Sequence, residues 1–255
     1  EIAALVGRAP GGGPMPALLG ALKLDVDQTK LDAVTSLADL AVDKVNASRL
    51  VDFDLVSTIE RVRKQMQIDG GPFELFTAAA ARLYANMAAT VQTEAMEAVL
   101  LPLLPKLVEQ WTSDDHTLRA FSLHAFANIL NMNKVAAADM VQAGYDWHAR
   151  LRSVFERVKE PLDPANAVIV EGAAKAVAAL CLHSREVEFF SASPSIIGTL
   201  LAMMSSRRLK SRKEAAWTIA ALCPTSATGV IVVGQAAGKT IDRIHDQQRK
   251  QRMQS

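Results

Sequence analysis

Apolar residues recur every three or four positions along most of the chain from Leu18 onward. This spacing puts apolar side chains on one face of an α-helix, so we expect a series of amphipathic helices. The run Asp69-Gly70-Gly71-Pro72 predicts the end of one helix and the start of the next, because glycine accepts a left-handed cap and proline suits a first turn. No stretch alternates convincingly with a period of two, and the pattern therefore predicts an all-α protein. The clearest spaced residues are Leu31, Val34, Leu37, Leu40, Leu55, Ile59, Val62 and Met66.

Four segments rich in small residues align with one another. Their equivalent positions are Asn86, Asn128, Ala179 and Ala221, which are 42, 51 and 42 residues apart. The longer step contains KEPLDPANA from Lys159, an insertion that accounts for the extra length. A three-helix unit of this size cannot bury its apolar face alone, so we expect successive units to stack. The segments are ARLYANMAAT, AFSLHAFANIL, EGAAKAVAALC and KEAAWTIAALC.

A period near 42 residues, with a turn glycine or proline and a small-residue-rich third helix, resembles the armadillo repeat. The best matches are MVQAG at 140–144 and KEAAWTIAAL at 213–222, and HEAT-type repeats share much of the pattern. The resemblance implies a right-handed α-solenoid over residues 73–243. We expect a flexible linker or arm at 1–17, helices forming a degenerate repeat or cap at 18–72, and a polar basic tail at 244–255.

The segment GVIVVGQAAGKT at 229–240 ends in Gly238-Lys239-Thr240 and suggests a phosphate-binding loop, which would make the protein a nucleotide enzyme. Such a loop needs a glycine five positions before Gly238, where Val233 stands. The alternative, which we favour, is that Gly238 corresponds to Gly144 and marks a turn in a final, truncated repeat. We therefore expect a non-catalytic protein without a cofactor.

In groove-binding members of the armadillo family, asparagines on the third helix hold the backbone of an extended peptide, often with a tryptophan one turn earlier. Asn86 and Asn128 match the asparagine position, and Trp217 matches the tryptophan position. The resemblance thus implies a partner-binding concave face, although the ladder is interrupted and the asparagines could instead serve packing or capping. The other residues at the tryptophan position are Arg82, His124 and Lys175.

A basic cluster follows Ser206 and is expected in the loop before a third helix. It could be a solvated loop, or it could bind an acidic peptide or a phosphate backbone. We expect no nucleic acid partner, because aromatic residues that stack on bases are not interleaved with the cations. The cluster consists of Arg207, Arg208, Lys210, Arg212 and Lys213.

The whole chain of 255 residues carries a net charge of +1, so no global field draws it to nucleic acid or membranes. Its two cysteines, Cys181 and Cys223, favour a reducing compartment, either the cytoplasm or an organelle such as a mitochondrion. We expect no metal site and no membrane span, because Lys106 and Lys175 interrupt the two most apolar stretches. The sequence therefore predicts a protein-interaction scaffold, either a subunit of a larger assembly or a transient peptide-binding adaptor, whose partners are other proteins.

Overall fold

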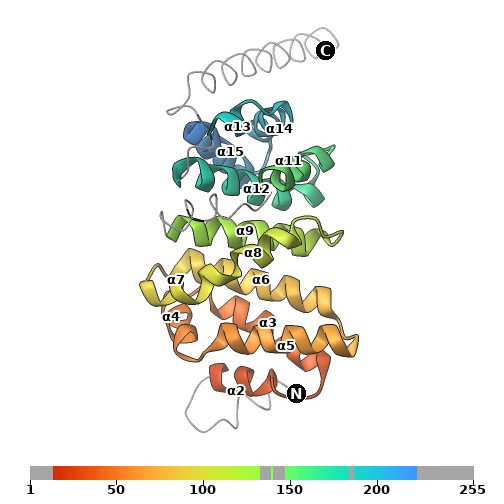
Figure 1. Ribbon diagram of the computed structural model, residues 1–255, viewed down its shortest axis with the longest axis vertical. Coiled ribbons are helices and arrows are strands. Elements are labelled where there is room, and N and C mark those ends of the chain that lie inside the picture. Colours follow the sequence, from red (N-terminus) through yellow and green to blue (C-terminus); the bar gives the residue numbers. More distant parts are fainter. Residues whose placement is uncertain (1–13, 133–138, 140–146, 184–186, 223–255) are drawn as a thin grey trace, which may run out of the picture. The chain divides into compact units, whose positions relative to one another are not determined.

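The computed structural model describes residues 14–132, 139, 147–183 and 187–222. The chain forms two compact units, Glu1–Ala136 (unit 1) and Ala137–Ser255 (unit 2). Every regular element in the described part is helical, which confirms the prediction of an all-α protein (Figure 1). The segments 1–13, 140–144, 229–240 and 244–255, on which several sequence predictions fall, lie outside the described residues.

Unit 1 repeats a pattern of two shorter helices followed by a longer third helix. The third helices α3, α6 and α9 pack against one another in that order (Figure 1). The three-helix groups are α4–α5–α6 and α7–α8–α9, and α2 covers α3 at the start of the unit. The elements are α2 (Pro14–Ala21), α3 (Asp27–Leu40), α4 (Lys44–Asp52), α5 (Leu55–Asp69), α6 (Phe73–Thr90), α7 (Glu94–Leu100), the 3₁₀ helix η1 (Leu101–Leu103), α8 (Leu104–Gln110) and α9 (His116–Met132).

Unit 2 follows the same pattern. Its long helices α12 and α15 pack directly against each other, and α11 and α14 lie beside them as second helices. The helices are α11 (Trp147–Arg157), α12 (Pro164–His183), α13 (Val187–Ser191), α14 (Pro194–Met204) and α15 (Leu209–Leu222). The four aligned positions Asn86, Asn128, Ala179 and Ala221 lie on α6, α9, α12 and α15, so each is on a third helix, as the alignment predicts.

The local sequence explains where these helices begin and end. Helix α5 ends at Asp69, where Gly70 adopts a left-handed conformation with φ of 72°, and α6 begins after Pro72, as predicted. Side-chain caps start other helices: Asp43 accepts a hydrogen bond from the Asn46 amide, and Thr93 accepts one from the Met96 amide.

Small residues and a few large rings fill the two cores. In unit 1, Trp111 and Phe126 meet edge to face with ring centroids 4.7 Å apart. In unit 2, Trp147 packs against Phe190 with centroids 5.9 Å apart. Both tryptophans are almost fully buried. Alanines on the third helices are also buried, which lets neighbouring helices approach closely.

The segment Pro164–Leu182 of α12 is long and apolar enough to cross a membrane, with a mean hydropathy of 1.6. The sequence prediction missed this because Lys175 interrupts the run. In the structure, 72% of the window is buried, and α15 packs along it. The burial is that of a core helix in unit 2, and length and composition alone are weak evidence for a span.

Candidate functional site

The third helices place the predicted groove residues of unit 1 on adjacent turns. The Arg82 guanidinium on α6 forms an ion pair with the Asp39 carboxylate on α3. The same guanidinium carbon lies 6.0 Å from the ring centroid of Phe121 on α9, within range of a cation–π interaction. Arg82 thus links the surfaces of three successive third helices, and His124, one turn after Phe121 on α9, is half-buried.

Asn86 and Asn128 use their amide donors within the fold. The Asn86 Nδ2 group donates to the Ala38 carbonyl on α3 over 2.8 Å, and the Asn128 Nδ2 group donates to the Ala85 carbonyl on α6 over 2.7 Å. Asn128 is only 8% exposed, whereas Asn86 is half-buried. These bonds tie each third helix to the one before it, so the packing role weighed for these asparagines has direct geometric support. Peptide binding by them stays a prediction.

In unit 2 the corresponding surface carries Lys175 on α12 and Trp217 on α15. The Trp217 side chain is 58% exposed, unlike the buried Trp111 and Trp147. Lys175 is half-buried, and burial is the main cause that lowers its pKa. The Glu214 carboxylate opposes that shift, while the neighbouring cations Lys210 and Lys213 add to it. This surface therefore combines an exposed aromatic ring with three cations, Lys175, Lys210 and Lys213, and the carboxylate of Glu214.

The basic cluster is divided between a loop and a helix. Arg207 and Arg208 precede α15, but Lys210, Arg212 and Lys213 lie on it, so the expectation that the whole cluster lies in a loop is corrected. Helix propagation explains the difference, because Leu209 and the following residues favour helix and Ser206 caps the turn by accepting from the Arg208 amide.

A fully buried carboxylate, Glu171 on α12, holds part of this cluster. The Ser211 hydroxyl donates to its Oε1 over 2.6 Å, and Arg208 Nε lies 3.3 Å from the same oxygen. Lys210 Nζ lies 3.5 Å from Oε2. Glu171 is 0% exposed, so these partners take the place of water around its carboxylate. Glu171 was not among the site residues predicted from the sequence, although an acidic residue within an alanine-rich third helix is a signal that could have indicated it.

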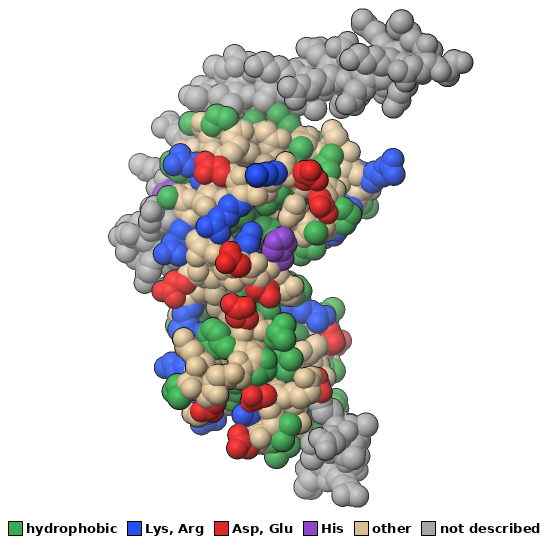
Figure 2. Space-filling view, turned by 90° about the vertical axis from the view of Figure 1, so that its right-hand side faces the viewer, with side chains coloured by type: hydrophobic (Ala, Val, Ile, Leu, Met, Phe, Trp, Pro, Cys, Tyr) green, Lys and Arg blue, Asp and Glu red, His purple; other side chains and the backbone are tan. Residues whose placement is uncertain are grey.

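Arg212 is also engaged, since its Nη1 group donates to the Ser206 carbonyl over 2.7 Å and to the Arg207 carbonyl over 3.1 Å. The side chains of Arg207 and Lys213, in contrast, are exposed. The basic cluster thus has a structural part, which stabilises the α12–α15 junction, and an exposed part that can meet a partner. Charged side chains of both signs are mixed on the face that Figure 2 shows.

Unit 1 contains a second charged network that the sequence did not reveal. The Glu60 carboxylate on α5 accepts from Lys106 Nζ over 2.7 Å and from Arg63 Nη2 over 3.0 Å, and the Tyr84 hydroxyl donates to it over 3.2 Å. Burial alone would raise the pKa of Glu60, but Lys106 and Arg63 outweigh it and the pKa is lowered. Burial and the Glu60 charge raise the pKa of Tyr84 well above its usual value. The network joins α5, α6 and α8.

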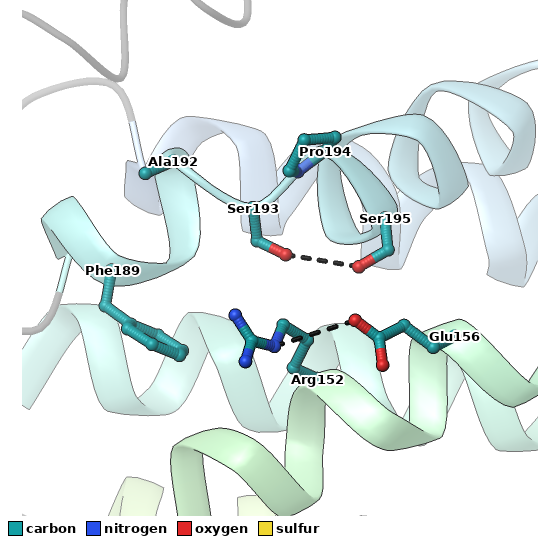
Figure 3. A pocket seen from close by; sticks show the side chains of 7 residues that line it. All are labelled: Arg152, Glu156, Phe189, Ala192, Ser193, Pro194 and Ser195. Atoms are coloured by element: carbon teal, nitrogen blue, oxygen red, sulfur yellow. Dashed lines mark hydrogen bonds and ion pairs between the residues drawn. The ribbon is translucent and has the colours of Figure 1, made fainter.

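Two adjoining grooves of about 480 and 430 Å³ run between α11 and the start of α14 in unit 2. Figure 3 shows Arg152 and Glu156 on one side of the first groove, with Ser193 and Ser195 on the other. Arg152 Nε lies 3.6 Å from the Glu156 carboxylate, and the two serine hydroxyls are 3.1 Å apart. These groups satisfy one another, and among the described residues no cluster of metal-ligating side chains occurs.

The most similar solved structures include designed repeat proteins. A designed armadillo repeat protein in complex with the peptide (KR)4 matches with a TM-score of 0.66 and 16% identity over 90% of each chain. A second designed armadillo repeat protein has a TM-score of 0.68 and 16% identity over 90% of this chain and 91% of that one. The chain has an armadillo-like repeat fold. An engineered protein of a structural genomics consortium also matches, with a TM-score of 0.67 and 19% identity over 90% of this chain and 88% of that one. No protein-family model matches the sequence, and no curated protein matches it.

Proposed function

We propose that this armadillo-like protein is a non-catalytic protein-interaction scaffold, a subunit or adaptor of a larger assembly, and that unit 2 binds an acidic segment of its partner. The observation that carries the proposal is the 58% exposure of Trp217 beside the cations of α12 and α15. Tryptophan is enriched among the residues that dominate protein interfaces, because it buries a large area at a small entropic cost. An exposed tryptophan on a repeat surface is therefore a candidate anchor.

Charge indicates the chemistry of the partner. Residues 1–136 contain 12 Lys and Arg against 16 Asp and Glu, for a net charge of −4, whereas residues 137–255 contain 16 against 11, for a net charge of +5. Lys210 and Lys213 lower the pKa of Lys175 against the opposing Glu214 carboxylate, and a second, incoming carboxylate would favour its charged form further. Acidic side chains are thus the natural complement of this surface.

The comparison with designed repeat proteins supports peptide or protein binding in general terms. One of them is in complex with (KR)4, a peptide of basic residues. Unit 2 has an excess of basic residues, so we propose a segment of the opposite charge here. Transient peptide binding is the alternative to permanent assembly, and the reducing compartment expected from the cysteines remains part of the proposal.

Affinity capture with quantitative mass spectrometry tests this function. The bait proteins are the wild type, Trp217→Ala, Lys175→Ala and the control Lys64→Ala, which removes an exposed cation from α5 of unit 1. We expect a set of partners that Trp217→Ala and Lys175→Ala lose and Lys64→Ala retains, because only the first two change the proposed surface. Partners that stay bound at high salt indicate permanent assembly, and partners that dissociate at high salt indicate a transient adaptor. Capture that is equal for all four baits would contradict the proposed site.

A further inference from the structure

Helix α15 exposes three positions that are buried on earlier third helices of the same register. On α6, which α9 covers within unit 1, they are Ala78, Ala81 and Ala85, at 3%, 1% and 5% exposure. On α12, which α15 covers within unit 2, they are Glu171, Ala174 and Ala178, at 0%, 0% and 1%. On α15 the equivalent residues are exposed. They are Lys213, Ala216 and Ala220, spaced to lie on one side of the helix and bordered by Trp217; we call these four residues the open face.

The α12–α15 junction shows how such a face is covered. The Thr218 hydroxyl of α15 donates to the Ala174 carbonyl over 2.9 Å, and Ser211 donates to Glu171 over 2.6 Å. The basic residues Arg208 and Lys210, at the start of α15, complete the contact by pairing with the Glu171 carboxylate. Alanines let the two helices approach closely. The buried Glu171 carboxylate favours a neighbouring helix whose first turn carries cations.

The charge at this controlling position is reversed on the open face, because Lys213 stands where α12 has Glu171. A helix that packs on α15 as α15 packs on α12 would bring its first turn over Lys213. Cations there, such as Arg208 and Lys210 on α15, would repel Lys213, whereas carboxylates would pair with it. A helix that docks on α15 in this register should therefore carry acidic residues in its first turn.

We propose that the open face of α15 docks an amphipathic helix of a partner protein, one with Asp or Glu in its first turn and small residues along the packing side. The proposal goes beyond the acidic segment placed beside Lys175, since it concerns the side of α15 that faces the next layer of a stack. Residues 223–255 of this chain are a poorer match in charge, with five Lys and Arg against two Asp and Glu. Acidic residues in the first turn also favour the helix itself, through its dipole.

Two peptides of residues 206–222 provide matched probes. The first keeps the natural sequence, with Arg208 and Lys210 in its first turns, and the second carries Arg208→Glu and Lys210→Glu. Fluorescence anisotropy of labelled peptides against the full chain measures the affinity of each. We expect the acidic peptide to bind the wild type at least tenfold more tightly than the natural one, since both charges that face Lys213 change from repulsive to attractive.

Charge exchange at Lys213 tests the open face, and Lys175→Ala separates that face from the proposed function. Lys213→Glu should weaken the acidic peptide at least tenfold and strengthen the natural peptide, while Lys64→Glu, an equal change on α5, should alter neither. Lys175→Ala should weaken the extended acidic segment and spare the helical peptide. If Lys213→Glu loses its circular dichroism signal, Lys213→Gln replaces it, with a smaller loss expected for the acidic peptide and a smaller gain for the natural one.

Three results would overturn the inference. One is that neither peptide binds. Another is that the affinities of the two peptides do not change when the charge at position 213 is changed. The third is that the chain covers the open face itself, either with residues 223–255 or with a second copy. Trp217 reports on the third, because its emission, obtained as the difference between wild type and Trp217→Phe, should be quenched by acrylamide if the face is open. Trp217 emission that acrylamide does not quench would contradict a partner helix. A dimer that is seen in light scattering and dissociates in Lys213→Glu would also contradict it.

Discussion

Glu171 shows how one residue can fix the packing of two repeats. It is fully buried on α12, whereas its partners Arg208 and Lys210 have side chains that are 41% and 56% exposed. Removing the carboxylate leaves two cations that can return to water. Removing the cations leaves a buried charge with only the Ser211 hydroxyl near it.

The two kinds of substitution should therefore differ in cost. We expect Glu171→Gln to lower the free energy of unfolding by about 1.5–3 kcal/mol, the range for a hydrogen bond to a charged group. The double variant Arg208→Ala, Lys210→Ala should cost about 3–5 kcal/mol, because it leaves the buried carboxylate without its cations. Urea unfolding measures both, with the exposed Arg207→Ala as the control. An equal cost for the two would mean that Glu171 does not depend on these cations.

The ion pairs of Glu60 should make the stability of unit 1 depend on pH. Lys106 and Arg63 hold its pKa below the ordinary value of 4.5, so the unfolded state binds its proton more readily than the folded state. The stabilisation is therefore present above the unfolded pKa and is lost as the pH falls through the lowered, folded pKa. We expect Glu60→Gln to lower the free energy of unfolding by about 1.5–3 kcal/mol at neutral pH, and by progressively less as the pH falls below the ordinary value of 4.5.

Urea unfolding at neutral and acidic pH tests this, with the exposed Glu109→Gln on α8 as the matched control. The difference in free energy of unfolding between wild type and Glu60→Gln should decrease as the pH falls. Glu109→Gln should have the same free energy of unfolding as wild type at both pH values. If the difference between wild type and Glu60→Gln does not change with pH, the charge of Glu60 does not contribute to stability.

At the scale of helices, two glycines have opposite roles. Gly70 ends α5 with φ of 72°, where a side chain strains the backbone, whereas Gly198 lies within α14 with open space where a Cβ would stand. We expect Gly70→Ala to lower the free energy of unfolding by about 1 kcal/mol and Gly198→Ala to raise it by about 0.5–1 kcal/mol. Thermal or urea unfolding decides this, and the same sign for both would refute the cap assigned to Gly70.

The order of elements was largely readable from the sequence, because helix periodicity and turn residues act locally. The spacing of Asn86, Asn128, Ala179 and Ala221 found the third helices, and Asp69 to Pro72 found a boundary. What stayed hidden depends on contacts across a whole repeat. Examples are the Asn128 bond to the Ala85 carbonyl and the Ser211 bond to Glu171, where the partners are 43 and 40 residues apart in sequence.

The candidate site was found only in part for the same reason. Trp217 was singled out by register, and its 58% exposure is consistent with that choice. Reading the basic cluster as one surface was incomplete, since no local pattern separates Arg208, which pairs with a buried carboxylate, from the exposed Lys213. Only the packing of α15 on α12 makes that distinction.

For the whole molecule, the net charge of +1 conceals a division between an acidic first unit and a basic second unit. The division matters for recognition, because a partner meets local charge and not the sum over the chain. It also gives the second unit a preference of sign that the fold alone does not provide.

Equilibrium binding of two eight-residue peptides, (DE)4 and (KR)4, to the full chain tests the central claim most directly. The account predicts that (DE)4 binds, that its affinity falls as salt is raised, and that Trp217→Ala weakens it by about tenfold, the equivalent of one well-packed anchor. It predicts no measurable preference for (KR)4. Binding of (KR)4 as tight as that of (DE)4, or an affinity for (DE)4 that Trp217→Ala leaves unchanged, would contradict it.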